Sequence, residues 1–331
     1  MERRSLGASG PTTTRMGLGL AALGRPAYIN LGHDEDLGAD LGVEAVERHA
    51  HEVLDAAFGS GVRYFDAARS YGRAEEFLAS WLRSRGIRPG ELTVGSKWGY
   101  RYVGEWRRDA EVHEVKDHSA QALRRQSEES LALLGGHLGL YQIHSATLET
   151  GVLDDRAVLS ELVRLGERGL TIGITTSGPN QGHAVGKALE AEVDGVNPFA
   201  CVQATWNPLE PSVASALADA HGAGWGVIVK EALANGRLTH READSSLRRR
   251  RRPLDRLAEA NGVGADAAAL AAALSQPWAD VVLSGAATRD QLARNLLALD
   301  VHPSPDDLSA LAEMALDPAD YWTRRAALPW T

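Results

Sequence analysis

The stretch VRYFDAARSYGRAEEFLASWLRSRGIRPGELTVGSK, residues 62 to 97, contains one complete strand-helix-strand unit. Its runs at 62–66 and 92–97 have the length and the β-branched and aromatic content of buried strands. Between them, residues 74–84 place apolar side chains at the three- and four-residue spacing of an amphipathic helix. Two strands joined through a helix lie parallel in one sheet. This unit therefore predicts an α/β protein with a parallel sheet.

The same alternation repeats along the whole chain. Further candidate strands occupy 16–20, 139–144, 171–175, 200–205, 225–229 and 280–284, and further candidate helices occupy 44–58, 119–134, 157–167, 181–190, 212–221, 254–274 and 289–298. Eight such units predict a closed (β/α)8 TIM barrel. Outside them lie a predicted N-terminal β-hairpin within 1–15 and an extra C-terminal helix and tail within 300–331. We expect residues 1–331 to form a single barrel domain.

Composition limits the functions that the chain can serve. A net charge of −9 argues against a general binder of nucleic acid or anionic membrane, because such proteins need a positive surface. Cys201 is the only cysteine, which excludes an internal disulfide and the usual cysteine-rich zinc sites. No segment has transmembrane or secretory character, so we expect a cytoplasmic protein. The run Arg248 to Arg252 is predicted to be a solvated loop, the alternative being a flexible loop over a phosphate-bearing ligand.

Four groups that can handle protons follow three consecutive predicted strands. Asp66 and Lys97 each end a strand, His144 ends the next, and Tyr71 lies just beyond the first. Strand ends form the active-site face of such a barrel. A lysine there needs a carboxylate partner, and its ammonium can lower the pKa of an adjacent tyrosine, making the phenol a usable acid for a carbonyl oxygen. The structural alternative is an ion pair that merely fills the barrel mouth.

The run YFDAARSYGRAEEFL, the GSK of the third strand, LYQIHSA and the eight-unit pattern together resemble the aldo-keto reductases, which are NADPH-dependent carbonyl reductases. The resemblance covers nearly the whole chain. It implies a catalytic tetrad of Asp66, Tyr71, Lys97 and His144. In that tetrad Tyr71 would be the general acid, Lys97 and Asp66 would tune it, and His144 would position the carbonyl.

The resemblance also implies where a nicotinamide would bind. Thr175 and Thr176 stand near the family's Ser-Asn pair, and Gln203 matches the glutamine that holds the carboxamide. Lys230 replaces the aromatic ring that usually stacks on nicotinamide. Either this cation disfavours the oxidised, positively charged cofactor, or it pairs with Glu231 and avoids the ring.

At the phosphate end, the resemblance places Ala286 where a basic residue for the 2′-phosphate would be expected. Arg289 and Arg294 are near enough to replace that residue, while Gln291 and Asn295 match the positions that contact adenine. We therefore expect NADPH as the cofactor, with NADH as the alternative.

Aromatic residues in two segments suggest the substrate pocket. Trp98, Tyr100 and Trp106 lie in the long third loop, and Trp322 lies in the tail. They favour a flat or hydrophobic small-molecule carbonyl compound or a sugar, although packing of the loop against the barrel explains them equally well. Two other functions remain: a nucleotide-binding regulatory or redox-sensor protein of the same fold with little turnover, and a metal-dependent barrel enzyme, for which the ligands are lacking. Substrate and oligomeric state stay open.

Overall fold

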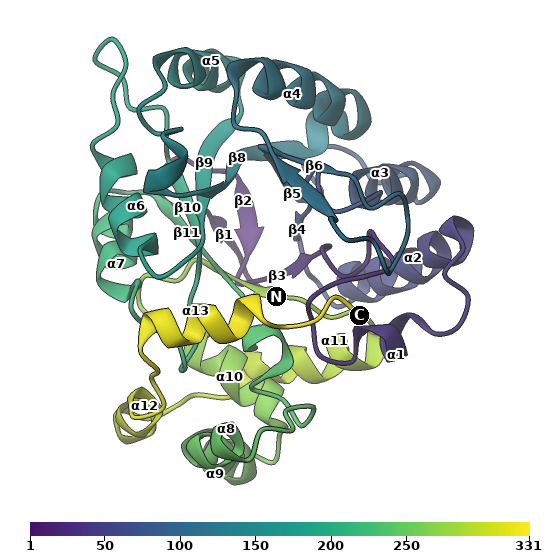
Figure 1. Cartoon of the computed structure of the whole chain (residues 1–331), viewed down its shortest axis with the longest axis vertical. Helices are drawn as coiled ribbons and strands as arrows, with labels where there is room; N and C mark the ends of the chain where they lie inside the picture. The colour runs from purple at the N-terminus through teal and green to yellow at the C-terminus, as the bar shows by residue number, and fades with distance from the viewer.

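Eight parallel strands close into a barrel in the computed structural model, which describes residues 1–331 (Figure 1). The barrel strands are β3 (Met16–Gly19), β4 (Tyr64–Asp66), β5 (Thr93–Trp98), β8 (Leu138–Ala146), β9 (Thr171–Thr176), β10 (Cys201–Thr205), β11 (Gly226–Lys230) and β12 (Val281–Ser284). Each strand pairs with the next in chain order, and β12 pairs with β3 to complete the ring. The predicted (β/α)8 barrel is thus confirmed.

Helices surround the ring of strands (Figure 1). The α-helices are α1 (His33–Leu37), α2 (Val43–Gly59), α3 (Ala74–Ser84), α4 (Ala120–Leu134), α5 (Arg156–Glu167), α6 (Gln181–Leu189), α7 (Ala214–Gly222), α8 (Ser245–Arg250), α9 (Arg252–Asn261), α10 (Ala265–Leu274), α11 (Arg289–Leu296), α12 (Pro305–Ala312) and α13 (Pro318–Ala326). The main apolar core lies between these helices and the barrel wall. None of the helices has the combination of length and apolarity that a membrane crossing requires.

A hairpin of β1 (Arg3–Ser5) and β2 (Thr12–Thr14) precedes the barrel, as predicted. Leu6, in its turn, is fully buried in a cluster with side chains from five barrel strands, among them Leu140 and Ile228. The hairpin therefore closes the end of the barrel where the strands begin. At the opposite end, where the strands end, the hairpin is absent and the loops that follow the strands surround the opening.

Tyr64 fills much of the barrel interior. It is fully buried, and its ring lies where side chains of two neighbouring strands would otherwise project. A Cβ atom at Gly17 or Gly95 would collide with this ring or its hydroxyl. Glycine at both positions is thus required by close packing.

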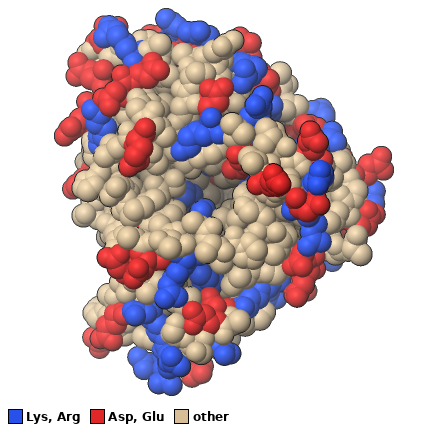
Figure 2. All heavy atoms as spheres, in the orientation of Figure 1, with Lys and Arg blue, Asp and Glu red and all other residues tan.

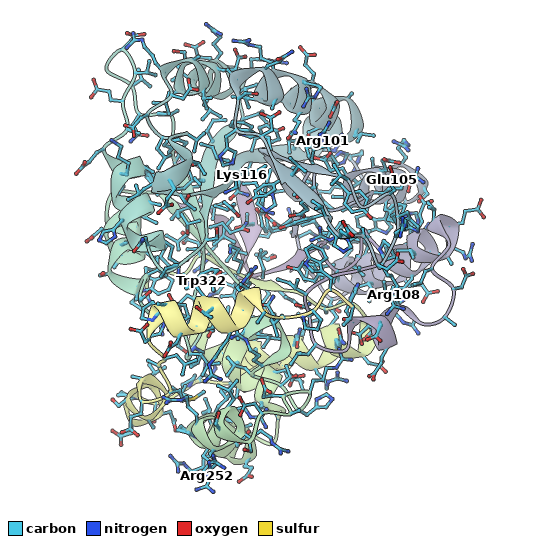
Figure 3. The ribbon with its side chains drawn as sticks, viewed as in Figure 1. Arg101, Glu105, Arg108, Lys116, Arg252 and Trp322 are labelled. Carbon is cyan, nitrogen blue, oxygen red and sulfur yellow. The ribbon has the colours of Figure 1, made fainter.

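The structure corrects two predictions in the seventh unit. The helix predicted for 254–274 is divided in two, because Gly262 adopts a left-handed conformation with φ of 65° and ends α9 before α10 begins. The run Arg248 to Arg252 forms the end of α8 and the start of α9, and is not a loop. Figure 3 shows the labelled Arg252 at the lower edge of the molecule, away from the barrel mouth.

Two segments cover the open end of the barrel. The long third loop contains a hairpin of β6 (Tyr100–Tyr102) and β7 (Glu114–Lys116). Helix α13 and the tail after it lie on the near side of the barrel in Figure 1. The tail reaches the loop after β3, where Tyr28 and Thr331 exchange two backbone hydrogen bonds of 3.0 and 3.1 Å.

We predict that Gly95→Ala lowers the free energy of unfolding by about 1 to 3 kcal/mol, the usual cost of overpacking a filled interior. In a Tyr64→Phe background the cost should shrink, because the hydroxyl nearest to the new methyl group is gone. Urea unfolding of the four proteins measures this coupling. Equal costs in the two backgrounds would contradict the proposed collision.

Candidate active site

A cavity of about 370 Å³ opens at the ends of the barrel strands. Figure 2 shows it as a hollow near the centre of the face, with atoms of lysine or arginine inside. Its wall combines strand-end residues with residues of the loop after β3, the β6–β7 hairpin, α11 and the tail after α13. Such convergence of loops at the strand ends is where sites in this architecture are built.

Asp66 lines this cavity and forms an ion pair with Lys97, which is buried behind the cavity wall. Both side chains are almost completely buried, and the Lys97 ammonium donates to Asp66 Oδ1 and to the Ala67 carbonyl oxygen. The other carboxylate oxygen of Asp66 accepts from Tyr64 Oη at 3.0 Å and from Gln203 Nε2 at 2.8 Å. Each charge is therefore matched, which a buried ionic group requires.

Tyr71 lies in the turn after β4, beside this ion pair. Lys97 Nζ is 4.8 Å from the centre of the Tyr71 ring. Burial, reinforced by the charge of Asp66, raises the pKa of Tyr71 well above its ordinary value. The net shift of the Tyr71 pKa is therefore upward, opposite to the lowering expected from the sequence, and the Lys97 ammonium donates to Asp66 and the Ala67 carbonyl oxygen. Tyr71 keeps its proton at neutral pH.

Gly24 and Gly72 fix the position of the Tyr71 turn. A Cβ at Gly24 would collide with the Tyr71 carbonyl oxygen, and Gly72 adopts a positive φ of 59° against the Gly24 backbone. The Arg73 amide then donates to the Gly24 carbonyl oxygen at 2.7 Å. The loop after β3 and the turn that carries Tyr71 are thus in backbone contact.

His144 ends the inward-facing part of β8. Its Nδ1 is 3.3 Å from Ser70 Oγ, and its ring makes edge contacts with Tyr71 and Tyr100 at 5.5 and 5.0 Å between centroids. Burial, together with the positive charge of Lys97, lowers the pKa of His144 well below its ordinary value. The imidazole is therefore neutral and faces the cavity beside the tyrosine.

The residues predicted to hold a nicotinamide are only partly together. Thr175 and Gln203 line the cavity, whereas Thr176 does not, and its hydroxyl approaches Gln181 at 3.5 Å. Successive strand residues face opposite sides, so Thr176 points away from the barrel interior. Ser177 lines the cavity instead.

Lys230 lines the cavity at the end of β11. Its ammonium donates to Thr205 Oγ1 at 2.8 Å and lies 4.0 Å from Glu231, whose carboxylate is already bound by Arg325 of α13. Burial lowers the pKa of Lys230 to about 8. Both sequence-based interpretations of Lys230 thus describe part of its surroundings: it faces the cavity, and it lies near Glu231.

At the other end of the cavity, four of the five predicted phosphate-end and adenine-end residues form the wall: Ala286, Gln291, Arg294 and Asn295. Arg289 is exposed and is not part of it. Arg294 is paired with Asp266 at 3.3 Å. Sequence analysis missed Asp36 of α1, which accepts hydrogen bonds from both Gln291 and Arg241 across the cavity.

Of the four predicted substrate-pocket aromatics, only Tyr100 lines the cavity. Trp98 is fully buried, Trp106 binds the Leu41 carbonyl oxygen at 2.7 Å, and Trp322 packs under Arg325, so the prediction for these three was wrong. Their bulk stabilises loops instead. The outer wall also contains Trp330 of the aromatic tail, and Arg25, Tyr28 and Glu114, which sequence analysis did not single out as pocket residues.

Comparisons with known proteins agree with this architecture. The aldo/keto reductase family model matches residues 15–315. Pyridoxal 4-dehydrogenase of Microbacterium luteolum is 29% identical over 154 residues, covering 40% of this chain and 40% of that protein. Aldo-keto reductase str7 of Strobilurus tenacellus is 27% identical over 227 residues, covering 67% of this chain and 58% of that protein. The matches therefore span less than two thirds of the length of either curated relative.

Among solved structures, the holo form of aldo-keto reductase AKR11C1 from Bacillus halodurans has a TM-score of 0.72. The match covers 96% of this chain and 97% of that one, at 19% identity. At this level of identity the likeness concerns the fold alone.

We predict that Lys97→Met destabilises the protein by about 3 to 5 kcal/mol, because it leaves the Asp66 carboxylate buried without its cation. Adding Asp66→Asn should recover most of the loss. Thermal and urea unfolding of the single and double variants measures the recovery. Additive losses would show that the two side chains are not coupled.

Proposed function

This chain belongs to the aldo/keto reductase family, and we propose that it is an NAD(P)H-dependent oxidoreductase that reduces an aldehyde or ketone to an alcohol by direct hydride transfer. The observation that carries this proposal is that Asp66, Tyr71 and His144 line one cavity, with Lys97 buried behind its wall and paired with Asp66. Carbonyl reduction needs a proton donor at the oxygen while hydride reaches the carbon. This group contains such a donor.

Tyr71 is the proposed general acid. The phenol is protonated at neutral pH, and the nearby Lys97 ammonium would stabilise the phenolate that forms when Tyr71 donates its proton to a carbonyl oxygen. His144 is neutral and beside the same ring, so one of its ring nitrogens can donate a hydrogen bond that orients that oxygen. Negative charge that develops on the carbonyl oxygen is stabilised by the nearby Lys97 ammonium, which Asp66 holds in position.

A nicotinamide dinucleotide fits the donor set along the cavity. Polar side chains of β9, β10 and α11 line it from the tetrad outward: Thr175, Gln203, Gln291 and Asn295. When bound, the reduced nicotinamide would supply the hydride. Gln203 would hold the carboxamide and Asn295 the adenine end, while Lys230 would lie near the nicotinamide.

We propose NADPH as the cofactor, with NADH as the alternative. Arg294 faces the cavity and could receive a 2′-phosphate, although Asp266 competes for its guanidinium. Arg241 is likewise bound to Asp36. A 2′-phosphate would therefore have to displace a carboxylate from one of these arginines. This competition reduces the expected difference in affinity between NADPH and NADH.

The proposed substrate is a small carbonyl compound with a flat or hydrophobic body. Tyr28, Tyr100 and Trp330 give the outer cavity aromatic walls. The name of one relative, pyridoxal 4-dehydrogenase, is consistent with the proposal that the substrate is an aromatic carbonyl compound. Binding of cofactor without reduction of any carbonyl compound would instead support the regulatory alternative.

We predict that Tyr71→Phe lowers kcat/KM for carbonyl reduction by roughly 100- to 10,000-fold, the usual worth of a general acid, while cofactor binding persists. Steady-state consumption of reduced cofactor and fluorescence titration measure the two effects. Tyr141→Phe is a matched control, because Tyr141 is buried outside the cavity. Equal activity of Tyr71→Phe and the control would remove Tyr71 from the proposed role.

We predict that the wild-type protein binds reduced cofactor more tightly than oxidised cofactor, and that this preference falls as the pH rises through about 8. Below that pH Lys230 is charged and repels the oxidised, cationic nicotinamide; above it the ammonium has lost its proton. Lys230→Met should reduce the ratio of dissociation constants up to about tenfold at neutral pH.

Fluorescence titrations between about pH 7 and pH 9 test this preference, with NADPH, NADH and both oxidised forms. Lys187→Met serves as a control, because that lysine pairs with Asp154 in a partly exposed surface ion pair. The role of Lys230 would be contradicted if the ratio of the dissociation constants for oxidised and reduced cofactor did not change with pH in the wild type and did not change on Lys230→Met substitution. Equal affinities for NADPH and NADH would count against the NADPH preference.

A further inference from the structure

Arg25 is a buried cation in the cavity wall. It lies in the loop after β3, is 2% exposed and lines the cavity. Its guanidinium is 5.2 Å from the centre of the Tyr71 ring. Burying a guanidinium is costly unless hydrogen-bond acceptors surround it. The contacts of Arg25 therefore indicate what the site is built to hold.

Protein groups accept hydrogen bonds from only some of the N–H donors of this guanidinium. Nε donates to the Ala21 carbonyl oxygen at 3.3 Å, and Nη1 donates to the Ser70 carbonyl oxygen at 3.2 Å and to Glu114 Oε1 at 2.5 Å. No protein group accepts from Nη2. Because a guanidinium carries two protons on each terminal nitrogen, two donors remain for a ligand in the cavity.

Aromatic rings enclose the same guanidinium. Its central carbon is 4.9 Å from the ring centre of Tyr28 and 4.8 Å from that of Trp330, in addition to the contact with Tyr71. These rings exclude water from the charge and present flat surfaces beside it. A ligand that reaches Nη2 must therefore pass along aromatic walls.

The charges around the tyrosine leave a positive excess. Arg25, Lys230 and Arg325 line this part of the cavity, facing two carboxylates, Glu114 and Glu231. Asp66 and Lys97 cancel each other. Figure 2 shows basic atoms within the hollow. In the part of the cavity around Tyr71, this excess of one cation favours an anionic ligand over a neutral one.

We infer that Arg25 selects carbonyl substrates that carry a carboxylate, by donating a charge-assisted hydrogen bond from Nη2 to that group while Tyr71 donates to the carbonyl oxygen. The inference rests on the proposed function and narrows its substrate class. Glu114 holds Nη1, so recognition uses one nitrogen and is not bidentate. The aromatic walls fit a planar ring between the carbonyl and the acid.

Matched substrates test this selectivity. The acids 3- and 4-carboxybenzaldehyde are compared with their methyl esters, which keep the ring and lose the charge. Because a hydrogen bond to a charged group is worth about 1.5 to 3 kcal/mol, wild type should favour one of the acids by roughly 10- to 100-fold in kcat/KM. Arg25→Met should abolish most of this ratio.

Two further variants separate recognition from folding. Arg101→Met makes the same charge change on the exposed face of the β6–β7 hairpin (Figure 3) and should preserve the acid-to-ester ratio. Glu114→Gln removes the carboxylate that competes for Arg25 and should increase the ratio. A purely structural role for Arg25 would lower the rates for acid and ester equally, and that result would overturn the inference.

A binding measurement distinguishes this inference from the proposed function. Calorimetric titration with benzoate and benzamide reports anion recognition without turnover, and Arg25→Met should weaken benzoate binding alone. Turnover of the esters with no preference for the acids would contradict the inference and leave the reductase proposal intact. Tighter benzoate binding in the absence of any carbonyl reduction would contradict the proposed function only, whereas equal binding of benzoate and benzamide would overturn the inference.

Discussion

The ion pair of Asp66 and Lys97 is the interaction on which the site depends. It lies inside the barrel, where neither charge could remain alone, and Asp66 also accepts hydrogen bonds from Tyr64 below it and from Gln203 on the far side. One carboxylate thereby joins strands β4, β5 and β10. Both carboxylate oxygens of Asp66 have hydrogen-bond donors, so the network holds its side chains in one arrangement. Tyr71 and His144 lie beside this network.

Further ion pairs organise the loops above that network. Arg325 joins the last helix to Glu231 after β11, and Arg25 joins the first loop to Glu114 of the hairpin. Each pair lies on the cavity wall, so ion pairs hold the loops that shape the pocket in addition to the packing of their aromatic side chains. Residues distant in sequence are thus brought to one small polar volume.

The strands, and the proximity of Asp66, Lys97, Tyr71 and His144 at their ends, could be predicted from the sequence, because a buried parallel strand is a short apolar run and a polar residue at its end is conspicuous. Pocket walls could not be predicted in this way. Whether Trp98 faces the cavity or the core depends on how the hairpin folds, and the loop containing Arg25 has no periodicity to read. The break at Gly262 was missed because apolar spacing continues across it, while one glycine in the left-handed region ends the helix.

The backbone pairing between Tyr28 and Thr331 has a kinetic consequence. The tail carries Trp330, which stacks on His113 of the hairpin segment at 4.2 Å between ring centroids, so the first loop, the third loop and the tail are fastened to one another. Movement of any one of these segments would either break these contacts or carry the other segments with it. Where entry of a ligand requires these segments to move, that movement is a single concerted step, whose rate would appear as a plateau in the observed binding rate at high ligand concentration.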